Sequence, residues 1–280
     1  MKMKTRRYQR GFWGKVLFFS ALIFIYPHHF SLADTRRIDT PSERYPRTNL
    51  LEPRRVIDAP TAATLPRGVF EADGRVYPSG GAQLALNIGI LSRFMFGISY
   101  GAQNLVSDDS PQWNPRVEFF TKYRIFDENW YFPALAVGYE RQGYGPFHDS
   151  LGRYLIKSKG FFAVATKTYS LEGLAAGFHG GINYNPFEGE KDGDKSPSFF
   201  VGQDTRISNY VAFLAEYDFA FDDDKNQQLF GRGWGYLNLG VRWLFSDNLW
   251  LEADFRDLFR NRTGVGSFGR ELRLIYVESL

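Results

Sequence analysis

Apolar and polar residues alternate along short segments from residue 66 onward. The segment from Arg116 to Ile125 is the clearest example. One set of alternate positions carries Val117, Phe119, Thr121, Tyr123 and Ile125, and the other set carries Arg116, Glu118, Lys122 and Arg124. Successive side chains of a β-strand point to opposite faces of the sheet. The period of two therefore predicts a strand with one apolar face and one charged face.

Twelve such segments follow one another, and short connections such as 91–93 and 246–248 alternate with long ones such as 102–114 and 142–156. The predicted strands are residues 70–76, 84–90, 94–100, 116–125, 133–140, 161–169, 174–184, 199–205, 209–221, 234–245, 249–258 and 271–277. Outer-membrane barrels combine an even number of antiparallel strands with short periplasmic turns and long extracellular loops. The pattern predicts an all-β fold, a transmembrane antiparallel up-and-down β-barrel of about 12 strands. The range is about 10–14, because one weak hairpin could be misassigned and 199–205 has the weakest pattern.

A soluble β-sandwich or a lipocalin-like barrel is the structural alternative, because alternation also suits a sheet with an apolar inner face and a polar outer face. Two features favour the membrane. The apolar faces are rich in aromatic residues, which make up 18% of the chain and suit interfacial girdles. The polar faces of the predicted strands also carry many charged residues, more than expected if the charges were confined to loops.

Residues 1–33 have the features of an export signal. A basic stretch precedes an apolar run at Val16–Tyr26, and Ser31-Leu32-Ala33 places small residues before a cleavage site at Asp34. A membrane-spanning helix needs about 20 apolar residues, so this run is too short to be a permanent anchor. We therefore expect a cleaved signal peptide, export by the general secretory route, and residence in a Gram-negative outer membrane.

Removal of this leader changes the net charge. The leader carries six of the 34 Lys and Arg residues and none of the 31 Asp and Glu residues, so 28 basic residues remain against 31 acidic ones. A slightly acidic chain gives no basis for a nucleic-acid partner. The chain has no cysteine, which excludes disulfides, thiolate metal sites, a catalytic thiol and acylation at a cysteine.

Residues 34–65 form a separate segment that is rich in Arg and Pro, and prolines at 41, 46, 53, 60 and 66 interrupt any regular element. The segment is either a flexible periplasmic tail or a plug that enters the barrel, with Arg54 and Arg55 bound to lumenal carboxylates. The predicted domains are thus a signal peptide at 1–33, a periplasmic tail or plug at 34–65, and an outer-membrane barrel at 66–280.

Alternation assigns a set of charged residues and one histidine to the lumen. They are Glu71, Asp73, Arg75, Arg116, Glu118, Lys122, Arg124, Glu140, Lys167, His179, Glu216, Asp218, Arg242, Glu252, Asp254, Arg256, Glu271 and Arg273. The two signs nearly balance, whereas a selective pore presents rings biased to one sign. Buried charges are stable only when they are paired and hydrogen-bonded. The lumen is therefore predicted to be either a closed, salt-bridged interior or a narrow polar channel lined by the same residues.

Motifs for catalysis are scarce, and we predict no catalytic residue, no cofactor and no metal site. His148-Asp149-Ser150 has triad residue types, but neighbours in one loop do not converge as a Ser-His-Asp triad must. An outer-membrane lipid hydrolase is the enzymatic alternative, although it would need a lipid-facing histidine and alternation points His179 into the lumen.

Two further motifs indicate loops. The run from Gly264 to Gly269 matches G-x-G-x-x-G, but it precedes a strand and opens no helix, so dinucleotide binding is not indicated. The acidic residues at 192, 194 and 222–224 lack the spacing of an EF-hand. We expect them to be solvated in outer loops, or to bridge lipopolysaccharide weakly through divalent cations.

The stretch Val56-Ile57-Asp58-Ala59-Pro60-Thr61-Ala62, followed by Pro66-Arg67-Gly68, resembles the opening of the YjbH-type outer-membrane barrel family. Shorter similar patterns occur at residues 77–81, 97–101, 114–115, 122–124 and 133–136. The family is associated with exopolysaccharide production and export, and the resemblance supplies no catalytic residues.

The strand pattern and the lumenal charges, together with the resemblance, predict a non-enzymatic barrel: a narrow channel or, as the resemblance implies, an accessory of envelope polysaccharide export. Polysaccharide or its export machinery would then be a partner. The other expected partners are outer-membrane lipids, lipopolysaccharide and, during biogenesis, the barrel-assembly machinery. A purely structural closed barrel with a salt-bridged lumen is the alternative function.

Overall fold

The computed structural model describes residues 53–171, 174–188, 192–224, 231–263 and 266–280. The predicted signal peptide and residues 34–52 lie outside these ranges. No helix in the described ranges is long and apolar enough to cross a membrane.

The described residues form fifteen strands, and twelve of them make up one barrel. The barrel strands are β1 (Val69–Tyr77), β2 (Gly81–Leu91), β3 (Phe94–Gln103), β5 (Glu118–Phe126), β6 (Ala134–Glu140), β9 (Gly160–Leu171), β10 (Leu174–Tyr184), β11 (Ser198–Arg206), β12 (Val211–Asp218), β13 (Tyr236–Ser246), β14 (Leu249–Arg256) and β15 (Gly269–Ser279). The other three are β4 (Gln112–Trp113), which extends the end of β3, and the hairpin of β7 (Tyr144–His148) and β8 (Arg153–Ile156).

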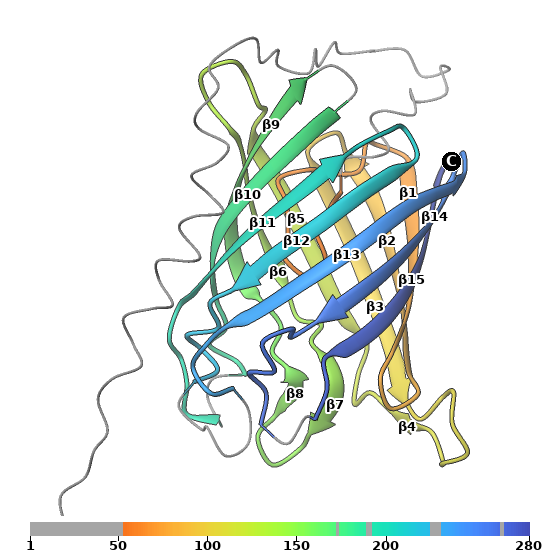
Figure 1. Ribbon diagram of the computed structural model, residues 1–280, viewed down its shortest axis with the longest axis vertical. Coiled ribbons are helices and arrows are strands. Elements are labelled where there is room, and N and C mark those ends of the chain that lie inside the picture. The colour runs from red at the N-terminus through yellow and green to blue at the C-terminus, as the bar shows by residue number, and fades with distance from the viewer. Residues whose placement is uncertain (1–52, 172–173, 189–191, 225–230, 264–265) are drawn as a thin grey trace, which may run out of the picture. The chain divides into compact units, whose positions relative to one another are not determined.

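Antiparallel pairing closes the barrel strands into a ring (Figure 1). Each strand pairs with the next barrel strand along the chain, and β15 pairs back with β1, from Val69 opposite Ser279 to Val76 opposite Leu272. Such closure leaves no free sheet edge. The prediction of a twelve-stranded up-and-down barrel is confirmed. The weakly patterned segment 199–205 is indeed a strand, β11.

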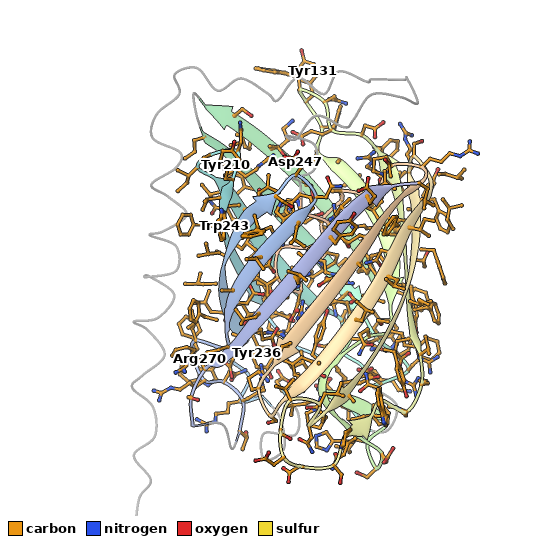
Figure 2. The ribbon with its side chains drawn as sticks, turned by 90° about the vertical axis from the view of Figure 1, so that its right-hand side faces the viewer. Tyr131, Tyr210, Tyr236, Trp243, Asp247 and Arg270 are labelled. Atoms are coloured by element: carbon orange, nitrogen blue, oxygen red, sulfur yellow. The ribbon has the colours of Figure 1, made fainter. Side chains whose placement is uncertain are left out.

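Burial alternates along the barrel strands with the period expected from the sequence. In β12, Phe213 is 47% exposed whereas Leu214, the next residue, is 2% exposed. In β13, Trp243 projects outward from the barrel wall (Figure 2). The inner positions include charged residues, and Glu118 and Lys122 of β5 are fully buried. Apolar side chains outside and charged side chains inside are the reverse of a soluble barrel, and they fit a barrel that spans a membrane.

The two ends of the barrel differ. One end holds the short turns and the C-terminal residues, and the other end holds the long connections with β4, β7 and β8 (Figure 1). We call them the short-turn end and the long-loop end. Leu280 donates its amide to the Gly68 carbonyl at 2.8 Å, so the chain enters and leaves the barrel side by side.

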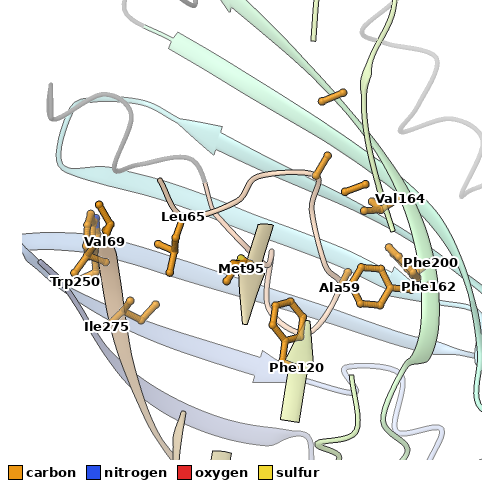
Figure 3. Packing of buried hydrophobic residues seen from close by; sticks show 14 of the residues in the cluster. Ala59, Leu65, Val69, Met95, Phe120, Phe162, Val164, Phe200, Trp250 and Ile275 are labelled. Atoms are coloured by element: carbon orange, nitrogen blue, oxygen red, sulfur yellow. The ribbon is translucent and has the colours of Figure 1, made fainter. Parts of the chain in front are cut away.

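An apolar cluster fills part of the barrel interior (Figure 3). Met95, Phe120 and Trp250 contribute to it from three separate strands, and Leu65 joins it from the segment that precedes β1. A water-filled pore would not carry buried apolar residues of this size across its lumen. The interior is therefore a packed core in this region.

Candidate functional site

Residues 53–65 form a hairpin inside the barrel, which we call the plug. Arg55 and Pro60 face each other in an antiparallel bridge. At the tip, the Val56 amide donates to the Ala59 carbonyl at 2.9 Å, which closes a tight turn. The tip side chains are buried, and Val56 has no exposed surface. The chain therefore enters the lumen, reverses direction and leaves again before the first strand.

The plug enters from the short-turn end. The Thr64 hydroxyl donates to the Ser92 carbonyl, in the turn between β2 and β3, at 3.3 Å. The Gly68 amide donates to the Gly89 carbonyl at 2.8 Å. The tip at residues 56–59 consequently points toward the long-loop end.

A single carboxylate holds the tip of the plug. Glu216 of β12 accepts three backbone amides on one oxygen, from Ile57 at 3.0 Å, Asp58 at 2.9 Å and Ala59 at 2.8 Å. Its other oxygen accepts from the Asn238 side chain at 2.7 Å. Three consecutive amides that converge on one anion form a compact anion-binding turn. The barrel wall supplies the anion, so Glu216 fixes both the conformation and the position of the plug.

The plug also presents its own carboxylate to the wall. Asp58 accepts from Arg75 of β1 at 2.8 Å and forms an ion pair with Arg256 of β14. Both arginines also bond to Glu271 of β15, at 3.1 and 2.7 Å. Arg75 in addition donates to the Ile57 carbonyl at 3.3 Å. Two cations thus share two anions, one from the wall and one from the plug.

Further wall cations bind the backbone of the plug. Arg242 donates to the Val56 carbonyl at 3.2 Å, and Arg273 donates to the Ile57 carbonyl at 3.4 Å. Both arginines also form ion pairs with Glu252 of β14. The peptide carbonyls of the plug therefore lie inside a charge network that the barrel strands build.

The two arms of the plug are bound in the same way. Arg54 forms an ion pair with Glu71, and Arg55 forms one with Glu140. The fully buried Lys122 donates to two plug carbonyls, each at 3.0 Å. The two ion pairs are the arginine–carboxylate contacts expected if the segment before the first strand is a plug and not a periplasmic tail.

A residue of a long loop meets the plug from the opposite side. Tyr144, at the start of β7, is buried, and its hydroxyl accepts from Arg55 at 3.2 Å. The guanidinium carbon of Arg75 lies 4.2 Å from the centre of the Tyr144 ring, and that of Arg256 lies 5.2 Å from it. The loop between β6 and β9 therefore folds inward as far as the plug.

Other long loops close over this one. The buried Arg153 of β8 donates to Asp223 at 2.7 Å and to Asp192 at 2.9 Å. Lys157 donates to the Asp222 carbonyl at 2.8 Å. The expectation that these acidic residues are solvated is wrong for Asp192, Asp222 and Asp223, whose side chains are buried beside cations of the β7–β8 region at the mouth of the barrel.

Two loop carboxyls at this mouth have unusual proton affinity. Burial raises the pKa of Glu188 to about 8, against the opposing effects of its hydrogen bonds from Ser158 and of the nearby Arg153 and Lys157. Burial also raises the pKa of Asp222 to about 7. The charge at the long-loop end is therefore expected to change near neutral pH, and with it the strength of the contacts that close the loops.

His179 lies in a chain of hydrogen bonds that ends on the plug. Its Nε2 lies 2.8 Å from Asp204 Oδ1, and its Nδ1 lies 3.0 Å from the Thr166 hydroxyl. The Ala62 amide of the plug donates to the same hydroxyl at 2.9 Å. Thr166, His179 and Asp204 come from three adjacent strands. The Thr166 hydroxyl is already hydrogen-bonded to the plug, so it is not free to act as a nucleophile. The chain of bonds therefore anchors the plug.

Little space is left around these contacts. Two cavities lie between the plug, the wall and the Tyr144 loop, and each has a volume of about 20 Å³. A water molecule needs roughly 10–15 Å³ on this measure. The described part of the lumen can hold isolated water molecules, and a continuous pore through these two cavities is absent.

The predicted lumen-facing residues occupy the inner positions of their strands, with one exception. Arg116 and Arg124 lie near the two ends of β5 and pair with Glu118 and Asp127 at 2.8 and 3.1 Å. The others contribute to the networks described above or to the adjoining wall. They are Glu71, Asp73, Arg75, Glu118, Lys122, Glu140, His179, Glu216, Asp218, Arg242, Glu252, Asp254, Arg256, Glu271 and Arg273.

The exception is Lys167, whose predicted lumenal position is wrong. It shares the outer face of β9 with Phe161 and Tyr169, and it donates to the Trp130 carbonyl at 3.1 Å. The inner face of β9 begins with the apolar core residues Phe162 and Val164 and continues with Thr166 and Thr168, so the apolar first half of the strand does not distinguish the two faces. A lysine on the outer wall near a barrel end can extend its side chain toward the adjacent turn, where backbone carbonyls bind its ammonium group.

Glycine at an inner strand position makes room for the plug, and the sequence analysis did not predict this role. Gly202 and Gly240 occupy inner positions, and a Cβ atom on Gly202 would lie 2.8 Å from a methyl carbon of Val56. A Cβ atom on Gly240 would instead clash with Oδ1 of Asp254, and at 3.4 Å it would be only in ordinary van der Waals contact with Ile57, so Gly240 makes room chiefly for the Asp254 side chain. Glycine at inner positions of otherwise charged strands is the available signal for a close approach of another chain segment.

No group of three or more His, Asp or Glu side chains in the described ranges could hold a metal ion. His148 and its neighbours form the turn of the β7–β8 hairpin, where the His148 carbonyl accepts amides from Leu151 at 3.1 Å and Gly152 at 2.7 Å. The glycine run 264–269 leads into β15, and its first two residues lie outside the described ranges.

No family model matches this chain, and no curated protein matches it either. Solved structures that resemble it include the KdgM porin, with a TM-score of 0.46 and 8% identity over 74% of this chain and 98% of that one. The Acinetobacter baumannii outer membrane protein Omp33 has a TM-score of 0.41 and 8% identity over 76% and 97%. An outer membrane channel from Pseudomonas putida F1 has a TM-score of 0.38 and 13% identity over 78% and 98%. These likenesses extend no further than the barrel fold.

Proposed function

We propose that this protein is a non-enzymatic outer-membrane channel that its own N-terminal segment holds shut. In this proposal a cleaved leader directs export, the short-turn end faces the periplasm, and the long loops face outward, as is usual for outer-membrane barrels. The plug then enters from the periplasm.

The observation that carries this proposal is the way in which the lumenal charges are used. Glu216, Lys122, Arg242 and Arg273 bind backbone amides and carbonyls of the plug. Water can replace a peptide group as a hydrogen-bond partner, so removal of the plug would leave a polar, solvated wall. A barrel with a purely structural role would not need a lumenal wall that stays polar and solvated once the plug is removed.

The test is conductance in planar lipid bilayers. The mature wild type should be almost silent, and a variant that lacks residues 53–65 should conduct steadily. Deletion of residues 107–110, which are exposed in the loop between β3 and β4, is the matched control and should stay silent. Each variant should migrate differently on gels before and after boiling, because a folded barrel resists detergent.

Two results would overturn the proposal. Large, steady conductance of the wild type would make the protein an open pore. A plug-less barrel that folds but stays silent would instead favour the purely structural role.

A role in envelope polysaccharide export is the second candidate, and one specific observation favours it. The stretch that resembles the YjbH-type family, Val56 to Ala62, is the same stretch that forms the tip and returning arm of the plug. The resemblance therefore falls on the part that we propose closes the channel. Loss of the gene should lower secreted polysaccharide, and unchanged polysaccharide would rule this role out.

A further inference from the structure

Two arginines of the barrel wall contact both the plug and the inward-folded loop. Arg75 and Arg256 bind the plug carboxylate of Asp58 on one side. On the other side their guanidinium groups lie over the ring of Tyr144, 4.2 and 5.2 Å from its centre. Both arginines are almost completely buried, with 3% and 2% of their surface exposed. We call Arg75 and Arg256 the arginine clamp.

The plug and the loop also touch directly. Arg55 of the plug donates to the Tyr144 hydroxyl at 3.2 Å and forms its ion pair with Glu140 at the same place. Tyr144 begins the short hairpin β7–β8, whose other strand carries the buried Arg153. The hairpin is therefore continuous from the arginine clamp to the charged contacts that close the long-loop end.

Withdrawal of Tyr144 would change the surroundings of the arginine clamp. The guanidinium groups of Arg75 and Arg256 would lose the aromatic ring and gain water on that side. An ion pair is weaker when water raises the local dielectric constant, so Asp58 would be held less tightly. Arg55 would also lose a hydrogen-bond acceptor. Both effects lower the free energy that keeps the plug in the lumen.

We propose that the arginine clamp couples the outer hairpin to the plug, so that outward movement of β7–β8 at the long-loop end loosens the plug, which enters the lumen from the short-turn end. This inference rests on the proposed function, in which the plug closes a channel, and it assigns the trigger that opens the channel to the long-loop side. Coupling of this kind is reciprocal, so loss of the plug must also loosen the hairpin.

The test uses the absence of native cysteine, because one introduced cysteine is then the only thiol in the chain. Ala62 is fully buried on the plug, and the rate at which a maleimide labels the variant Ala62→Cys reports plug release. Adding Tyr144→Ala should raise this rate about tenfold, within the usual range of coupling between sites. Tyr144→Phe keeps the ring and loses only the hydroxyl, so its effect should be smaller.

Tyr131→Ala is the matched control, because it removes an aromatic ring that is 84% exposed in the turn between β5 and β6, at the short-turn end (Figure 2). Its labelling rate should not change. The reciprocal measurement uses Gly202→Leu, which should displace Val56 without touching the hairpin. Trypsin should then cleave faster after Arg153, which is shielded while the loops are closed.

The outcomes separate the two proposals. Fast labelling of the Ala62→Cys variant without any second substitution would show that the plug is not seated, and it would overturn both. Slow labelling that Tyr144→Ala leaves unchanged, with the barrel folded on gels, would overturn the coupling alone. Unchanged trypsin cleavage in the Gly202→Leu variant would overturn it as well.

Discussion

Replacement of Glu216 by glutamine should release the plug from the barrel wall. The carboxylate accepts three plug amides, at 2.8 to 3.0 Å, and one Asn238 amide at 2.7 Å. Glutamine has nearly the same shape, so it can keep the geometry while it removes the charge. A hydrogen bond to a charged group contributes about 1.5–3 kcal/mol, and a neutral one about 0.5–1.5 kcal/mol. Three weakened amide bonds therefore cost about 3 kcal/mol, which corresponds to a roughly hundredfold larger population of released plug.

The labelling rate of the Ala62→Cys reporter measures this population. In the Glu216→Gln background the rate should rise by about two orders of magnitude, provided that the plug opens and closes faster than the reagent reacts. Asp149→Asn removes an exposed loop carboxylate and is the matched control, with no change expected. If Glu216→Gln left the rate within twofold of the reporter alone, the three amide bonds would not hold the plug and the reasoning would be refuted.

Three further results are expected. Arg near the bilayer midplane costs about 2–4 kcal/mol on the lipid face, so Phe213→Arg should block assembly, and a normal yield of folded barrel would contradict the outward assignment. Leu214→Arg should still assemble but should crowd the plug and raise conductance, and a silent, folded variant would count against the packing of Leu214 on Val56 and Ile57. Because the pKa of Glu188 is raised, its stabilising effect on loop closure is complete below its ordinary value of 4.5 and is lost as the pH rises through about 8. Cleavage of the loops by trypsin, divided at each pH by its cleavage of an unfolded peptide, should therefore be faster at alkaline pH. Glu188→Gln should reduce this dependence to the part that Asp222 contributes, whereas an equal dependence in variant and wild type would show that Glu188 does not control closure.

The strands of the barrel could be predicted from the sequence because one face of each strand meets lipid. In β5 and β12 a mistake of one residue would expose charges to the membrane, so the alternation is strict and fixes both strand and facing. The rule fails at Lys167, because Phe162 and Val164 make the first half of the inner face of β9 as apolar as its outer face.

The plug and the inward loop could not be located by periodicity, because neither has a repeating pattern. The tip of the plug is a tight turn whose amides are satisfied by Glu216, a residue 157 positions away from Ala59. Tyr144 likewise gains its role from Arg75 and Arg256 of β1 and β14 and from Arg55 of the plug, all of them distant in sequence. Residues so far apart in the sequence come together only because the strands close into a ring, so a local sequence pattern does not reveal these contacts. The near balance of lumenal charge predicted pairing inside the barrel, but it did not indicate that many of the partners are peptide groups.

If residues 53–65 occupy the lumen, an engineered disulfide can join the plug to the barrel wall. A Cβ atom on Gly202 would lie 3.4 Å from the Cβ atom of Val56, close to the separation of about 3.5–4.5 Å found in disulfides. In intact outer membranes, the double variant Val56→Cys and Gly202→Cys should therefore oxidise to a single cross-linked species, whose boiled form changes mobility on reduction. If both thiols stay free and react with maleimide at the rate of an exposed cysteine, residues 53–65 do not lie against Gly202 in the lumen.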